Sequence, residues 1–262
     1  MIIRNKKRVY AIPSLLVLGA LACGFSLGSE EPTPGPDLAG TQAALEATRQ
    51  ALANLQAQPT ADPEPADDSG NDSTQGDDPA FYVEEFSSVP QSWTYFLLRG
   101  DDLDFDLYME RDRLVYDIDG PNVWAYYTYD SWSYTDVRVD ARAENLGSNN
   151  NNVSLICRYN DRGWYEFNVA NNGLYWIYRY DDRTGDFQEL YSGGVQNLRV
   201  GKDTNEYTII CQGDRLTLGI NGVEIRTVTD SNYDEGLIGV SVSSFDNYPV
   251  LVEFDWVEIS QP

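Results

Sequence analysis

The sequence predicts an all-β domain in which two antiparallel sheets pack face to face. From Phe81 to the C-terminus, apolar and polar residues alternate in short runs, which is typical of strands with one buried face. These runs are separated by Gly, Asn, Asp and Pro, the residues that tight turns need. No helical period competes with the alternation in this region. Roughly ten or more such strands in one domain favour a two-sheet sandwich.

Ahead of this domain, residues 1–22 have the features of an export signal. A basic start is followed by a short apolar run and by Ala20-Leu21-Ala22-Cys23. This order indicates a secretory signal, too short for an ordinary membrane span. With Cys23 at the cleavage point it resembles a bacterial lipobox, so we expect a lipid on Cys23 that holds the chain to the bacterial cell membrane with its domain outside. An ordinary secretory cut, with Cys23 incidental, is the alternative.

Residues 23–80 form a segment rich in Pro, Ala, Gln and Asp. It has too few apolar residues to build a core, so we expect an acidic tether. The spacing of Leu38, Leu45 and Leu52 predicts a short helix near residues 38–57. This helix is either a weak self-association element or a solvated spacer, because its pattern covers fewer than the ~3–4 heptads of a convincing coiled coil.

Composition limits the classes of function. The chain has 18 basic and 42 acidic residues and a net charge of −24, and such a surface repels nucleic acid. It contains no His, which excludes Ser-His-Asp and Cys-His catalysis and His-ligated zinc. Two of its three Cys, Cys157 and Cys211, lie in strand-like stretches of the domain. An even pair in an exported protein predicts a disulfide, with two buried free thiols as the alternative.

The first strand-like run of the domain alternates apolar residues from Leu103 to Met109 with acidic ones. Its Asp residues also resemble a calcium loop, but Leu107 stands where that loop requires Gly and Arg113 where it requires Glu. We therefore interpret the run as a strand with one solvated face. Further strands are predicted at residues 114–118, 124–129, 137–143, 206–211, 216–220, 223–228, 237–242 and 250–259.

The middle of the domain, residues 153–180, predicts three strands joined by two tight turns. Tyr165 and Phe167 alternate with Trp164 and Glu166, and the neighbouring runs alternate in the same way. Asn160-Asp161-Arg162-Gly163 and Asn171-Asn172-Gly173 supply residues that tolerate positive φ, as hairpin turns require. Asn221-Gly222 is the strongest hairpin signal elsewhere in the chain.

These motifs carry a family resemblance over about residues 81–260. Their order is ICRYND, WYEFNVANNG, NEYTIICQGDRLTLGINGVEI, DSNYDEGLIGV and VEFDWVEI. It resembles the concanavalin A-like jelly roll of the laminin-G and glucanase group, closest to the bacterial 3-keto-disaccharide hydrolase or glucanase-like domain. With the Cys and Pro-rich stalk ahead of it, the chain also resembles bacterial surface lipoproteins. The resemblance implies a two-sheet antiparallel jelly roll that is a glycan-binding module, a glycoside hydrolase or an adhesion module.

Two groups of residues are candidates for function. Glu253, Asp255 and Glu258 match E-x-D-x-x-E, which resembles the nucleophile and acid/base motif of laminarinase-like glycosidases. We expect Glu253 and Glu258 on opposite faces of a structural strand, with Phe254 and Trp256 in the core. The favoured ligand-binding residues are aromatic rings that can stack on sugars, with polar neighbours that can bind hydroxyls: Arg158, Trp164, Glu166, Asn168, Trp176, Tyr178 and Tyr180.

No cofactor is expected, but several loop carboxylates could hold a structural Ca²⁺: Asp181, Asp182, Asp186, Asp230 and Asp234. The sequence thus favours a membrane-anchored module that binds a polysaccharide or glycoconjugate without catalysis. A glycoside hydrolase and an adhesion or structural module with a protein partner are the alternatives. The aromatic residues could equally be core residues covered on both faces.

Overall fold

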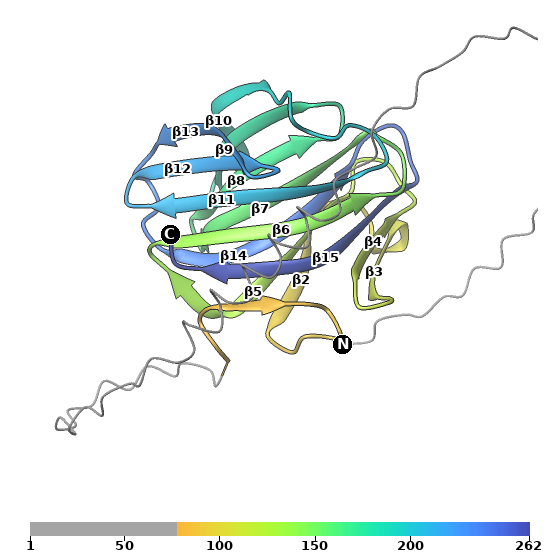
Figure 1. Ribbon diagram of the computed structural model, residues 1–262, viewed down its shortest axis with the longest axis horizontal. Coiled ribbons are helices and arrows are strands. Elements are labelled where there is room, and N and C mark those ends of the chain that lie inside the picture. The colour runs from red at the N-terminus through yellow and green to blue at the C-terminus, as the bar shows by residue number, and fades with distance from the viewer. Residues whose placement is uncertain (1–77) are drawn as a thin grey trace, which may run out of the picture. The chain divides into compact units, whose positions relative to one another are not determined.

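A computed structural model describes residues 78–262, which form two antiparallel sheets packed face to face (Figure 1). The eight-stranded sheet has the order β13-β12-β11-β6-β15-β4-β3, and β1 pairs with β15. The seven-stranded sheet has the order β10-β9-β8-β7-β14-β5-β2. The three strands that the sequence predicts within residues 153–180 are neighbours in the seven-stranded sheet, as expected for a meander.

The strands of the eight-stranded sheet are β1 (Tyr82–Glu84), β3 (Phe105–Met109), β4 (Leu114–Ile118), β6 (Val137–Asn145), β11 (Thr204–Gln212), β12 (Arg215–Ile220), β13 (Val223–Thr229) and β15 (Val250–Ser260). Those of the seven-stranded sheet are β2 (Trp93–Arg99), β5 (Trp124–Tyr134), β7 (Asn151–Asn160), β8 (Gly163–Ala170), β9 (Leu174–Asp181), β10 (Asp186–Gly194) and β14 (Gly236–Ser244). One 3₁₀ turn, η1 (Asp102–Asp104), precedes β3, so this strand begins two residues later than its predicted run.

The core lies between the inner faces of the two sheets and follows the predicted alternation. Val153, Leu155 and Cys157 of β7 point inward together with Tyr165 and Phe167 of β8, and all five are buried. Cys157 and Cys211 form a disulfide, with their Cα atoms 6.8 Å apart. The bridge joins β7 in one sheet to β11 in the other, so it fastens the two layers directly through the core. The disulfide prediction is confirmed.

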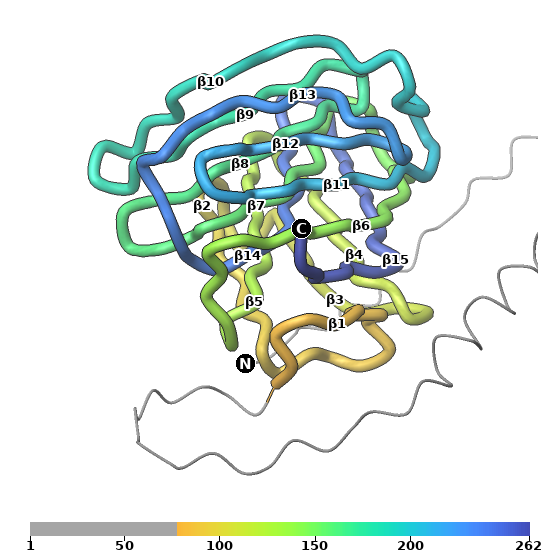
Figure 2. The backbone as a smooth tube through the Cα atoms, turned by 60° about the vertical axis from the view of Figure 1, so that its left-hand side comes forward, coloured from red at the N-terminus to blue at the C-terminus, as the bar shows by residue number. Residues whose placement is uncertain are grey.

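The predicted hairpins are present. Asn221 and Gly222 join β12 to β13 with φ of 49° and 76°, the two positive values that a tight type I′ turn requires. In both views the β9–β10 and β12–β13 hairpins lie at the same edge of the sandwich (Figure 2). There the Arg226 guanidinium of β13 stacks over the Tyr191 ring of β10, 3.6 Å from its centroid. This contact joins the two sheets at that edge.

The last strand, β15, contains a bulge that changes which residues enter the core. Phe254 pairs with Ala143 of β6, but the next pair is Trp256 with Arg142, so Asp255 is an extra residue. Phe254 is fully buried as predicted, whereas Val257 takes the next core position and Trp256 turns outward, only half-buried. The expected core position of Trp256 is therefore wrong, because an extra residue reverses the alternation of faces beyond it.

Several predictions concern residues outside the described part of the chain: the signal at 1–22, the lipid on Cys23, the helix near 38–57 and the tether up to residue 77. Within residues 78–262, no helix has the length and the apolar character that crossing a membrane would require.

Candidate functional site

The outer face of the seven-stranded sheet carries most of the predicted ligand-binding residues. Glu166 of β8 pairs with Tyr178 of β9, and Asn168 pairs with Trp176. Paired residues on neighbouring antiparallel strands share a face, and their inward neighbours Phe167 and Ile177 are buried in the core. The predicted separation of faces along β8 and β9 therefore places these four side chains together.

One part of this face is filled by rings that pack on each other. We call this group the aromatic cluster: Phe96, Tyr126, Tyr159, Trp164, Tyr180 and Phe187. The Trp164 and Tyr180 ring centroids are only 4.0 Å apart, and Phe96 stacks on Tyr126 at 5.0 Å. Trp164 is 1 % exposed and Tyr180 4 %, so neither ring presents a free face to a ligand. Both residues lie on the outer face of the seven-stranded sheet, as the alternation predicts, but their rings pack against other rings.

Beside the aromatic cluster the same face is hollowed into a cleft of about 350 Å³. The cleft combines half-buried rings with polar groups, the usual make-up of a small-ligand site. Of the predicted residues, Glu166, Asn168, Trp176 and Tyr178 line it. The full lining is Trp124, Asn152, Glu166, Asn168, Trp176, Tyr178, Phe187, Ser243 and Phe245.

Glu166 lies at the floor of the cleft and is 2 % exposed. Its Oε2 accepts hydrogen bonds from the Tyr126 hydroxyl at 2.8 Å and from Trp164 Nε1 at 3.1 Å. Its Oε1 accepts from the Ser154 hydroxyl and from Asn168 Nδ2, each at 3.1 Å. A carboxylate offers about four acceptor positions, and all are occupied here. Glu166 therefore orients the groups around it and has no free lone pair for a proton from a substrate.

Two polar atoms at the cleft remain without a hydrogen-bond partner. Among the residues that the structure describes, Nε1 of Trp124 and Oδ1 of Asn168 are buried and unpaired. A buried polar group with no partner costs about 1–3 kcal/mol, so these two atoms lower the stability of this part of the sheet. Burial, followed by the nearby Glu189 and Glu166 charges, raises the pKa of Tyr178 to about 12. Its hydroxyl thus stays protonated and able to donate.

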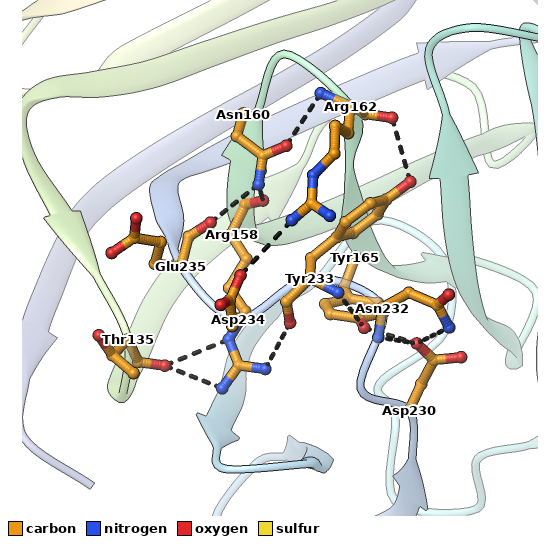
Figure 3. A network of polar contacts seen from close by, with 10 residues as sticks. All are labelled: Thr135, Arg158, Asn160, Arg162, Tyr165, Asp230, Asn232, Tyr233, Asp234 and Glu235. Atoms are coloured by element: carbon orange, nitrogen blue, oxygen red, sulfur yellow. Dashed lines mark hydrogen bonds and ion pairs between the residues drawn. The ribbon is translucent and has the colours of Figure 1, made fainter.

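Arg158, a predicted hydroxyl-binding residue, points away from the cleft. It has a φ of 56° at a bulge in β7, and its side chain is 1 % exposed. The guanidinium donates to the Thr135 carbonyl at 2.8 and 3.2 Å and to the Tyr233 carbonyl at 2.9 Å (Figure 3). Because the bulge reverses the faces beyond Cys157, Arg158 holds together two loops at one end of the sandwich and is not available to a ligand in the cleft.

Two of the candidate calcium ligands, Asp230 and Asp234, are engaged in separate contacts. Asp230 accepts hydrogen bonds from the Tyr165 hydroxyl at 2.6 Å and from Asn232 (Figure 3), and it pairs with Arg179 at 2.8 Å. Burial acts to raise the Asp230 pKa, but these bonds and the Arg179 charge outweigh it and lower the pKa below its ordinary value. Asp234 faces Arg162 at 3.4 Å. Residues 78–262 contain no group of three carboxylate, Cys or His side chains placed to hold a metal ion.

The E-x-D-x-x-E motif lies on the outer face of the other sheet. The bulge at Asp255 places Glu253 opposite Glu144, and Glu258 opposite Asp140. Both carboxylates therefore share a face, and the prediction that they lie on opposite faces is wrong. Their β6 partners are four residues apart, so their Cα positions are separated by about 13 Å.

The carboxylates at the start of the motif are held by Arg side chains. Arg113 contacts Glu253 at 2.8 Å and Asp255 at 2.9 Å, and Arg142 contacts Asp255 at 3.0 Å. Retaining glycosidases need their two carboxyl groups about 5–5.5 Å apart across a groove. The motif lines neither of two cavities in the described residues, which have volumes of about 440 and 350 Å³.

Five residues that line the cleft were not predicted: Trp124, Asn152, Phe187, Ser243 and Phe245. Trp124, Ser243 and Asn152 lie side by side on β5, β14 and β7. These strands are far apart in the sequence, and only their pairing in the sheet brings the residues together. The alternation in Gly239–Ser244 predicts that Ser243 lies on the face opposite to that of buried Val242. The residues near Ser243 in the sequence do not indicate which strand lies beside this one in the sheet.

Comparison with known proteins shows a fold and no family. No protein-family model and no curated protein match the sequence. The structure is similar to the β-glucanase of Bacillus licheniformis, with a TM-score of 0.53, 11% identity and coverage of 70% of this chain and 99% of that one. A lichenase from a mouse hindgut metagenome gives 0.52, with 12% identity and coverage of 70% and 100%.

The laminarinase catalytic domain of Thermotoga maritima gives a TM-score of 0.52, with 9% identity and coverage of 69% of this chain and 97% of that one. Identities this low establish the architecture and nothing finer. Residues 78–262 therefore have the concanavalin A-like jelly-roll fold of these glucanases.

Proposed function

We propose that this chain is a non-catalytic glycan-binding module whose site is the cleft on the seven-stranded sheet. The observation that carries this proposal is a cleft that combines half-buried rings with polar side chains. Trp176 and Tyr178 offer flat apolar surface to the C–H face of a sugar ring. Asn152, Asn168 and Ser243 add amide and hydroxyl groups to the lining, and such groups can hydrogen-bond the hydroxyls of a sugar. The fold shared with glucanases is consistent with a carbohydrate ligand.

The hydrogen bonds that Glu166 accepts support glycan binding without hydrolysis. It is the one carboxylate that lines the cleft among the described residues, and its oxygens are already saturated with hydrogen bonds. Glycoside hydrolysis ordinarily needs two carboxyl groups with separate acid and base or nucleophile roles. Glu189 pairs with Tyr178 one strand further on, but it is exposed, does not line the cleft and accepts a hydrogen bond from Ser192.

Trp176→Ala is expected to weaken glycan binding at least about tenfold, since a buried Trp anchor commonly contributes 1.4 kcal/mol or more. Stability should change little because the ring is half-buried on an outer face. The measurement is a glycan array followed by calorimetric titration of each glycan that binds. Trp256→Ala is the matched control: it removes a half-buried Trp from the outer face of the other sheet and should leave binding unchanged.

The same experiment separates the rival functions. Release of reducing sugar from a bound glycan, abolished in Glu166→Gln or Glu189→Gln, would show a hydrolase and overturn the proposal. Equal loss of binding in Trp176→Ala and Trp256→Ala would place the effect outside the cleft. A blank array together with capture of a specific protein partner would support the adhesion module instead.

We also propose that Cys23 is the mature N-terminus and carries the lipid that anchors this module outside the cell. The support is the basic, apolar and small-residue order that precedes it. Cys23→Ala should release the protein from the membrane fraction, because the acyl chains supply the attraction to the bilayer. If the amount of Cys23→Ala protein in the membrane fraction equals that of the wild type, this proposal is wrong. The double variant Cys157→Ala and Cys211→Ala is the control for loss of thiols and should stay membrane-bound.

A further inference from the structure

The cleft is closed on one side by two rings that meet across the curved sheet. Trp124 is on β5 and Phe187 is on β10, with β14, β7, β8 and β9 between them. Five strand spacings in a flat sheet would separate these strands by about 24 Å. The ring centroids are nevertheless 5.5 Å apart, in edge-to-face contact. The sheet must therefore curl strongly, and the two side chains bridge its hollow face.

This bridge, which we call the aromatic wall (Trp124 and Phe187), is supported from behind. The Phe187 centroid lies 4.7 Å from that of Tyr180, 5.6 Å from Tyr178 and 6.3 Å from Trp164. On the other side, the Arg99 guanidinium stacks on the Trp124 ring at 4.3 Å. Rings packed on several neighbours have few alternative rotamers, so the wall is a fixed boundary of the cleft and not a side chain that a ligand can easily displace.

A glycan that is bound through one of its internal sugar units must extend out of the cleft in two directions. The aromatic wall blocks one of them, while the cleft continues on the other side to Asn152, Ser243 and Phe245. A sugar unit seated against the wall can therefore be linked to the rest of its glycan on one side only. From this geometry, and on the basis of the proposed glycan-binding function, we infer that the cleft selects the terminal unit of a glycan chain and excludes internal units.

The polar groups of the lining are compatible with this role. Asn152 and Ser243 lie on the side of the cleft that stays open, and their amide and hydroxyl groups can hydrogen-bond a terminal or an internal sugar unit. They add affinity without selecting the chain end. Selection of the end therefore depends on the steric boundary formed by the aromatic wall.

The test compares binding capacity with the number of chain ends. A mixed-linkage β-glucan, a xylan and a mannan are each used intact and after partial acid hydrolysis, at equal sugar mass. The moles of wild-type domain bound at saturation should rise in proportion to the ends that hydrolysis creates. Phe187→Ala removes half of the wall, so its capacity should follow sugar mass and stay the same after hydrolysis. Phe187→Tyr keeps the ring and should behave as the wild type.

The outcomes are distinct for the two proposals. Binding that is lost in Trp176→Ala but has equal capacity on intact and hydrolysed chains would overturn end recognition and leave the glycan-binding function standing. No binding of any of the three polysaccharides, in either form, would overturn both. If Phe187→Ala does not fold, as judged by its thermal unfolding, Trp124→Ala opens the same wall from β5 and takes its place.

Discussion

Replacing Cys157 and Cys211 together by Ala is expected to lower the free energy of unfolding by about 4 kcal/mol. The bridge closes a loop of 54 residues, and the chain-entropy model gives this order of magnitude for the constraint it places on the unfolded chain. Both sulfurs lie in the core between the sheets, and both residues are fully buried. The variant therefore also loses contacts that hold β7 against β11.

Urea unfolding of the oxidised wild type, the reduced wild type and the double-Ala variant measures this effect. Reduction should bring the wild type close to the variant and should leave the variant itself unchanged. A difference below about 1 kcal/mol between the oxidised wild type and the variant would mean that the denatured chain is already compact without the bridge.

Trp164→Ala is expected to cost about 3–5 kcal/mol of stability, the usual range for removing a large aromatic side chain from a packed site. Trp164 is 1 % exposed and lies at the centre of the aromatic cluster, with its centroid 4.0 Å from Tyr180 and 5.3 Å from Tyr126. Its removal also withdraws one of the four hydrogen bonds to the buried Glu166 carboxylate. The cleft floor should loosen, so binding should weaken along with stability.

Two further variants separate packing from hydrogen bonding at this position. Trp164→Phe keeps a ring but loses the donor to Glu166, and should cost about 1–3 kcal/mol. Trp176→Ala removes a Trp from the same face, where it is half-buried, and should cost clearly less than Trp164→Ala. Equal losses for Trp164→Ala and Trp176→Ala in denaturant unfolding would show that the aromatic cluster is not a packed unit.

The sequence by itself determined the fold class, the disulfide and the faces of the strands wherever the alternation is unbroken. Alternation with a period of two assigned Phe167 to the core and Glu166 to the outer face, because successive side chains of a strand point in opposite directions. The Asn221-Gly222 turn was predictable for a similar local reason, since these residues adopt positive φ at low cost. An even pair of strand cysteines was sufficient to predict the bridge.

Local alternation failed where a bulge inserts one residue. Beyond Cys157 and beyond Phe254 the faces are reversed, and this sends Arg158 into a loop network, Trp256 outward, and Glu258 to the same face as Glu253. A bulge is decided by how two paired strands fit each other, so one strand alone does not reveal it. The candidate glycosidase motif could be judged only after this register was known.

Only the tertiary structure decided which outward rings are packed and which are accessible. Trp164 and Trp176 are equivalent in the sequence pattern, yet the curl of the sheet buries Trp164 under Phe96 and Phe187 and leaves Trp176 in the cleft. The same curl brings Trp124 and Phe187, 63 positions apart in the chain, into contact. Sheet curvature sums small twists over many strand pairs, and no local run of residues specifies that sum.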